Sequence, residues 1–144
     1  MLSDPFVFAD RSACDIIRRA NNFWERSSPL ETLARAHLMV DIISSKLGSD
    51  ILLLDLTGVT LIADYFVIAT GESARQLSAI AETLAQQLKQ EQQIVPLAIE
   101  GTVNGGWVLL DFGSIVVHLF DPEQRARYNL EEFWSDARTI MRMA

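Results

Sequence analysis

The stretch GGWVLLDFGSIVVHLF, residues 105–120, predicts a β-hairpin whose two faces differ in character. Gly113-Ser114 suits a two-residue turn between two apolar runs. With that turn, six apolar side chains share one face and are expected in the core: Val108, Leu110, Phe112, Ile115, Val117 and Leu119. The opposite face pairs Trp107 with Phe120, Leu109 with His118 and Asp111 with Val116.

This second, mixed face allows two interpretations. A sheet with helices on both sides would cover it. A sheet open on one side would instead expose Trp107 and Phe120 beside Asp111 and His118. The pattern is equally compatible with both arrangements.

Hydrophobic periodicity around the hairpin predicts an α+β fold, with a mixed β-sheet of about five strands flanked by helices. The further strands are expected at residues 51–56, 64–71 and 94–99, and Pro96 places the third of these at an edge or a bulge. The helices are expected at residues 30–47 with a stop at Gly48, from a Ser73 cap to residue 90, at residues 122–127, and from Asn129 to about Met141.

The chain divides into an N-terminal extension, residues 1–30, and a domain, residues 31–144. The extension contains one short helical pattern, residues 13–24, and equal numbers of acidic and basic side chains. The domain therefore carries the whole net charge of −7. An acidic domain repels phosphate backbones, so we expect little direct nucleic-acid binding and favour a basic protein partner.

Neither a membrane-spanning run nor a signal peptide is recognisable in the sequence, and its one cysteine cannot form an internal disulfide. We therefore expect a cytoplasmic protein without membrane partners.

Side chains for catalysis are missing from the expected places. Asp55, Asp64 and Asp111 each lack a second carboxylate two residues away, so no strand offers the paired acids of a metal-dependent transferase. No phosphate-binding glycine motif is present, and the loop 71–73 offers one glycine before a helix. We expect no catalytic residues, no metal site and no cofactor.

Four segments in the same order and spacing resemble the ribosomal silencing factors, also called the Iojap family. They are DYFVIATGESARQ (64–76), EG (100–101), GGWVLLDFGSIVVHLF (105–120) and RARYNLEEFW (125–134). The resemblance implies a fold similar to nucleotidyltransferases but without their catalytic acids. It also implies binding to ribosomal protein fourteen on the intersubunit face of the large subunit, which blocks joining of the small subunit and represses translation.

The hypothesis is then a partner-binding surface and no chemistry. Its expected contact residues are Asp64, Tyr65, Glu100, Trp107, Leu109, Asp111, His118 and Phe120. Three alternatives stay open: nucleotide binding or residual nucleotidyl transfer at residues 71–73, a role in ribosome assembly, and a homodimer through the mixed face. The sequence departs from the family pattern at Ser114, where an acid or asparagine is usual, and at Arg127, where an aromatic is common.

Overall fold

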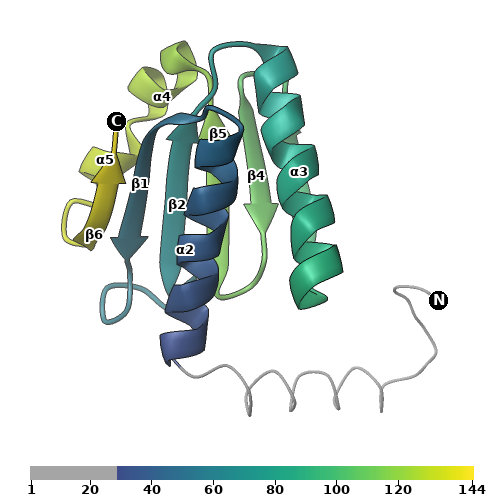
Figure 1. The fold of residues 1–144 in the computed structure, drawn as a ribbon. Helices are drawn as coiled ribbons and strands as arrows, with labels where there is room; N and C mark the ends of the chain where they lie inside the picture. Colours follow the sequence, from purple (N-terminus) through teal and green to yellow (C-terminus); the bar gives the residue numbers. More distant parts are fainter. Residues whose placement is uncertain (1–28) are drawn as a thin grey trace. The chain divides into compact units, whose positions relative to one another are not determined.

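The computed structural model describes residues 29–144, and the residues from Arg35 onward form one compact unit. This unit is built on a six-stranded mixed sheet (Figure 1). Its strands are β1 (Ser49–Asp55), β2 (Tyr65–Thr70), β3 (Ala98–Thr102), β4 (Trp107–Asp111), β5 (Ile115–Phe120) and β6 (Arg138–Met143). They lie in the order β3-β4-β5-β2-β1-β6, and β2 with β5 is the parallel pair.

Four helices accompany the sheet in the described part of the chain: α2 (Pro29–Ser45), α3 (Ala74–Gln92), α4 (Pro122–Tyr128) and α5 (Leu130–Phe133). The part of α2 after Ala34 lies beside α3 over one face of the sheet (Figure 1). Helix α3 buries Leu77, Ile80, Leu84 and Leu88, at the spacing of one helical stripe. The α+β class expected from the sequence is confirmed, with one strand more than expected.

Gln76 links the end of α2 to the start of α3. Ser73 caps α3 as predicted, since its hydroxyl accepts a hydrogen bond of 3.1 Å from the Gln76 amide. The Gln76 side chain donates from Nε2 to the Leu47 carbonyl at 2.8 Å. Leu47, with φ of 66°, takes the left-handed conformation that ends α2, so the predicted stop at Gly48 falls one residue late.

The hairpin of residues 105–120 has the predicted register. Trp107 pairs with Phe120, Leu109 with His118, and the Phe112 amide donates to the Ile115 carbonyl at 2.9 Å across the two-residue turn. All six side chains predicted for the core are buried: Val108, Leu110, Phe112, Ile115, Val117 and Leu119. The period-two pattern together with the Gly113-Ser114 turn is sufficient to predict this hairpin, because a slip of one residue would expose all six side chains.

The last predicted helix is wrong beyond its first turn. Helix α5 ends at Phe133, and residues 138–143 form the edge strand β6, antiparallel to β1. Arg138 pairs with Asp55 at 2.9 Å and Arg142 with Asp50 at 3.0 Å, both on β1. The outer edge of β1 needs a partner for its backbone groups, and this long-range pairing outweighs the local helical spacing.

Two further expectations have simple outcomes. The predicted strand at residues 94–99 lies later, as β3, and it is an edge strand that begins after Pro96. The helix expected at residues 13–24 lies outside the described residues. Among residues 29–144 no helix is long and apolar enough to cross a membrane.

Candidate protein-binding face

The mixed face of the hairpin continues across the whole sheet, on the side opposite α3. Strand pairing aligns its residues in rows, one of which runs from Glu100 through Leu109 and His118 to Ile68. A neighbouring row joins Thr102, Trp107, Phe120 and Thr70. Residues in one row have neighbouring side chains on the same face.

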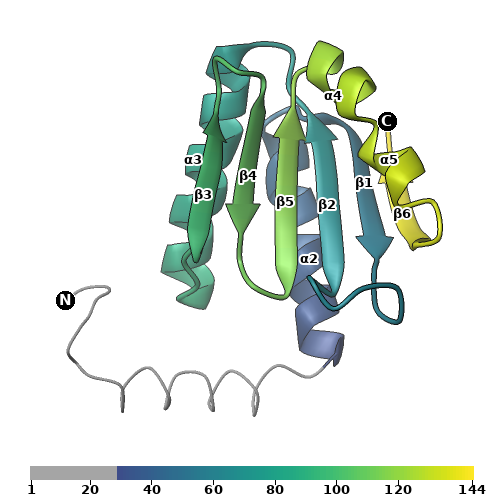
Figure 2. The ribbon, with the colours of Figure 1, turned by 180° about the vertical axis from the view of Figure 1, so that it is seen from behind.

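Helices α4 and α5 cover only half of this face. Leu130 and Trp134 pack on a cluster of buried residues from β1, β2 and β5 that includes Phe66, Ile68 and Phe120. Figure 2, viewed from this side, shows α4 and α5 beside β1 and β2, with β3 and β4 uncovered. The covered arrangement is therefore correct for the half at β1 and β2, and the open arrangement is correct for the half at β3 and β4.

The uncovered half, here called the open face, consists of six residues on β3 and β4. They are Ala98, Glu100, Thr102, Trp107, Leu109 and Asp111. Each is exposed or half-buried, whereas the residues of β4 that point the other way, Val108 and Leu110, are buried. Four of the eight predicted contact residues, Glu100, Trp107, Leu109 and Asp111, lie together here.

Trp107 is the largest side chain on the open face. Its ring stacks on Phe120 with centroids 5.0 Å apart, and its indole Nε1 donates to His118 Nδ1 at 3.3 Å. Tyr128 from α4 packs on it with centroids 4.6 Å apart. Trp107 is therefore held on several sides and still partly exposed, which is the arrangement of an interface anchor.

His118 and Phe120 require a correction. Both were expected as direct contacts, yet they are 5% and 1% exposed. The rings of Phe66 and Trp134 cover this part of the sheet from β2 and from the segment after α5. Burial lowers the pKa of His118 from 6.5 to about 4, so the ring is neutral at pH 7. Both side chains lie beside the open face, next to Leu109 and Trp107, and support it.

Tyr65 requires a second correction. Neighbouring residues of a strand point to opposite faces, and Phe66 lies on the side of Trp134, so Tyr65 points to the side of α3. It is 7% exposed. Burial raises the pKa of its phenol, and the carboxylates of Asp55 and Asp64 act in the same direction. Tyr65 is not part of the open face.

The two aspartates differ in their availability. Asp64 is exposed and lies beside the hairpin turn, since its amide donates to the Ser114 carbonyl at 2.8 Å. Asp111 is half-buried on the open face, and its Oδ1 accepts a hydrogen bond of 2.8 Å from the Gly113 amide. Asp111 therefore stabilises the turn in addition to placing negative charge on the face.

Tyr128 belongs to the same surface and was not predicted from the sequence. It is 47% exposed, lies against Trp107, and carries the Arg127 guanidinium 5.9 Å from its ring centroid. Arg127 thus packs on the neighbouring aromatic ring. The signal that could have identified Tyr128 is the short helix cap at Asp121, which brings α4 back over the end of β5.

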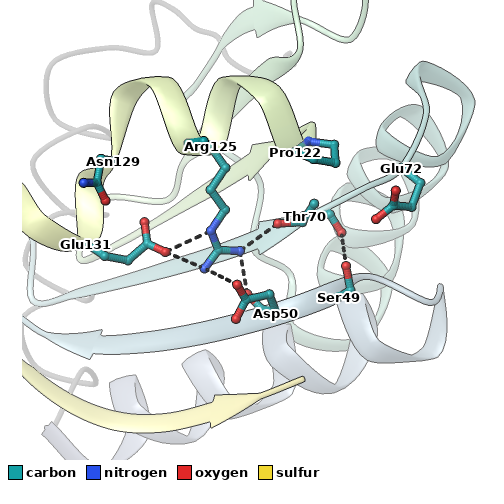
Figure 3. A pocket seen from close by; sticks show the side chains of 9 residues that line it. Ser49, Asp50, Thr70, Glu72, Pro122, Arg125, Asn129 and Glu131 are labelled. Atoms are coloured by element: carbon teal, nitrogen blue, oxygen red, sulfur yellow. Dashed lines mark hydrogen bonds and ion pairs between the residues drawn. The ribbon is translucent and has the colours of Figure 1, made fainter.

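A buried arginine fixes α4 in this position. Arg125 forms an ion pair with Glu131 at 2.9 Å, and its Nη1 donates to the Asp50 carbonyl and to Thr70 Oγ1 (Figure 3). A pocket of about 360 Å³ lies around this group. Because two carboxylates, Glu131 and Asp50, already neutralise the arginine, the pocket is not built for an anion.

The loop at residues 71–73, the alternative site for a nucleotide, is occupied by its own contacts. The Gly71 amide donates to the Phe120 carbonyl at 2.8 Å, and the Glu72 amide donates to Gln76 Oε1 at 2.7 Å. These amides are not available to hold a phosphate. Within residues 29–144, no group of three or more His, Cys, Asp or Glu side chains could hold a metal ion.

Fold and face together define a small α+β domain with a half-covered mixed sheet, whose open face carries an aromatic and two acidic side chains. The model of the family described as "Ribosomal silencing factor during starvation" matches residues 29–143. The chain belongs to this family, and the resemblance seen in its motifs is confirmed.

Individual relatives agree with this assignment. The ribosomal silencing factor of Halalkalibacterium halodurans is 42% identical over 103 residues, which cover 72% of this chain and 87% of the relative. The chloroplastic protein Iojap of Zea mays is 35% identical over 116 residues, which cover 81% of this chain and 50% of that protein. A crystal structure of a Chromobacterium violaceum protein superposes with a TM-score of 0.66 at 33% identity, covering 69% and 82% of the two chains.

Proposed function

We propose that this protein is a steric silencing factor: it binds ribosomal protein fourteen at the intersubunit face of the large subunit and blocks joining of the small subunit, which represses translation. It acts in the cytoplasm and has no enzymatic activity. Membership of the ribosomal silencing factor family supports the ribosomal target. The observation that carries the mode of action is the open face, where Trp107 lies partly exposed among Glu100, Leu109 and Asp111.

The chemistry of this face suits a basic protein. An aromatic anchor supported from below and surrounded by polar groups is the arrangement that gives protein interfaces their affinity. Glu100 and Asp111 place negative charge beside it, and Asp64 adds a third carboxylate near the hairpin turn. Attraction between an acidic face and a basic partner accelerates association and weakens as salt increases.

Sedimentation with purified large subunits tests the proposal. Trp107→Ala is expected to remain folded and to lose co-sedimentation, with at least about a 30-fold weaker affinity for a central aromatic anchor. Phe133→Ala is the matched control, because it removes a 74% exposed aromatic from α5, outside the open face. Equal binding by wild type and Trp107→Ala would place the interface elsewhere.

A subunit-joining assay separates silencing from the assembly alternative. Purified protein added to mature large and small subunits is expected to lower the yield of joined ribosomes in proportion to occupancy, and Trp107→Ala is expected not to. Binding to large subunits with no effect on joining would favour an assembly role. Light scattering of the free protein over a concentration series tests the homodimer, which would cover the same face.

A further inference from the structure

The contact beneath Trp107 assigns a task to a buried residue that the proposed function leaves without one. We propose that His118 is a positioning residue, which holds the Trp107 indole in its binding orientation by accepting the indole N–H on Nδ1. This inference rests on the proposed function, because it concerns the anchor of the same face.

The geometry restricts the indole from three directions. Trp107 Nε1 lies 3.3 Å from His118 Nδ1, the indole ring stacks on Phe120, and Tyr128 packs on it from α4. His118 itself cannot move freely, because it is 5% exposed and its ring lies 4.6 Å from the ring of Phe66. A fixed acceptor next to a partly exposed donor selects one rotamer of the tryptophan.

The protonation state of the imidazole agrees with this task. Nδ1 accepts a hydrogen bond only when it carries no proton, so the neutral ring has its proton on Nε2. Burial keeps His118 neutral at pH 7 by lowering its pKa to about 4. The acceptor is therefore present at pH 7.

The other ring nitrogen indicates that His118 is not there for core packing alone. Nε2 is buried and has no hydrogen-bond partner among residues 29–144. A buried N–H without a partner is destabilising, and an apolar side chain of similar size would avoid that cost. The gain that offsets this cost is the bond from Nδ1 to the anchor.

An ordered indole binds more tightly than a mobile one. A side chain that already occupies its bound rotamer loses less conformational freedom on association. The expected effect of His118 is therefore on affinity for the partner, through Trp107, and a substitution at His118 should have no effect when position 107 lacks an N–H donor.

The test combines three substitutions at His118 with two residues at position 107. His118→Asn retains an acceptor near the place of Nδ1, whereas His118→Leu has none. His118→Phe, which retains a planar ring, is the second acceptor-free variant should Leu unfold the protein. Each is made with Trp107 and with Trp107→Phe, and affinity for purified large subunits is measured by sedimentation together with thermal stability.

Loss of the acceptor is expected to weaken binding about tenfold when Trp107 is present, and less than about twofold in the Trp107→Phe background. His118→Asn is expected within about threefold of wild type. The ¹⁵N-detected indole N–H resonance of Trp107, assigned by its loss in Trp107→Phe, should shift and exchange faster in the acceptor-free variants and be retained in His118→Asn.

Three results would overturn the inference: equal losses in both backgrounds, an indole resonance unaffected by His118→Leu and His118→Phe, or full affinity in a folded acceptor-free variant. Failure of the proposed function looks different. In that case Trp107→Ala binds large subunits as well as wild type does, or neither binds, while the indole resonance still reports whether His118 holds Trp107.

Discussion

Arg125 on α4 donates a hydrogen bond of 2.8 Å from Nη1 to Thr70 Oγ1 at the end of β2. The same guanidinium pairs with Glu131 on α5, so one buried side chain joins both C-terminal helices to the sheet. Tyr128 is carried by the helix that this contact holds, and Tyr128 packs on Trp107. Through Tyr128, the buried Arg125 thus influences the open face without being part of it.

Replacing Arg125 by methionine is expected to lower the free energy of unfolding by about 2–3 kcal/mol. The methionine retains an apolar stem but leaves Glu131, the Asp50 carbonyl and Thr70 without their donor. Breaking a fully buried pair costs about 3–5 kcal/mol, and the value here is lower because the Glu131 side chain is 25% exposed. Urea denaturation measures the change.

Arg127→Ala on the same helix is the control for this substitution, because Arg127 is exposed. Its effect is expected below about 0.5 kcal/mol, as for most surface positions. Equal stability of the two variants would show that the Arg125 contacts contribute little beyond packing.

Reversing the charge at Glu100 is expected to slow association with large subunits. Glu100 is exposed on the open face opposite Leu109, so Glu100→Lys puts a positive charge where a basic partner approaches. The association rate should fall about threefold or more at low salt, and the difference should shrink as salt rises. Stopped-flow mixing at several salt concentrations measures both effects.

Glu91→Lys changes the net charge by the same amount at an exposed position of α3, away from the open face. Its association rate should stay close to that of wild type. Identical slowing in both variants would mean that total charge, and not the charge of this face, controls the encounter.

Gly101 shapes the open face through close backbone contact. It has φ of +82°, and a Cβ at this position would collide with the Trp107 carbonyl oxygen. Gly101→Ala is therefore expected to push β3 away from β4 at the anchor residue, to destabilise the fold by about 2–3 kcal/mol and to weaken binding to large subunits.

Gly58→Ala isolates the steric part of that effect. Gly58 has φ of +81°, nearly the same backbone conformation, but a Cβ there would meet nothing within 4 Å. It should cost about 1 kcal/mol and leave binding unchanged. If both alanine variants are equally stable and bind equally well, the contact between Gly101 and Trp107 has no role in the face.

The parts of this fold that the sequence predicts are those governed by local patterns. The hairpin register follows from strict alternation around Gly113-Ser114, and the start of α3 follows from the Ser73 cap. Strand β6 could not be predicted in this way, because its stabilising partners, Asp50 and Asp55, lie more than 80 residues earlier. A short stretch of sequence does not contain the distant residues with which β6 pairs.

The site shows the same division. Strand alternation correctly places Trp107, Leu109 and Asp111 on one face, whereas Glu100 lies beyond the strand expected at residues 94–99 and joins them because β3 extends to Thr102. It cannot say which half of that face the C-terminal helices cover, so His118 and Phe120 were expected on the surface although they are buried. Tyr128 enters the surface through the fold of α4 against β5, which no repeat in its own segment indicates.

The buried histidine makes stability depend on pH in a narrow range. In the unfolded chain the pKa of His118 returns to about 6.5, whereas in the folded protein burial lowers it to about 4. Between these values the unfolded state binds the proton and the folded state does not, so the free energy of unfolding falls as pH decreases from about 6.5 to 4. The full effect is on the order of 3 kcal/mol.

Urea denaturation of wild type and His118→Asn at half-unit pH steps isolates this effect, since His37 and the carboxylates are common to both proteins and their contributions cancel in the difference. The difference between the two proteins should change only within this range and stay constant above pH 7. Parallel curves from pH 7 to pH 4 would mean that His118 is protonated equally in the folded and unfolded chains, and that it is not the neutral acceptor on which the orientation of Trp107 depends.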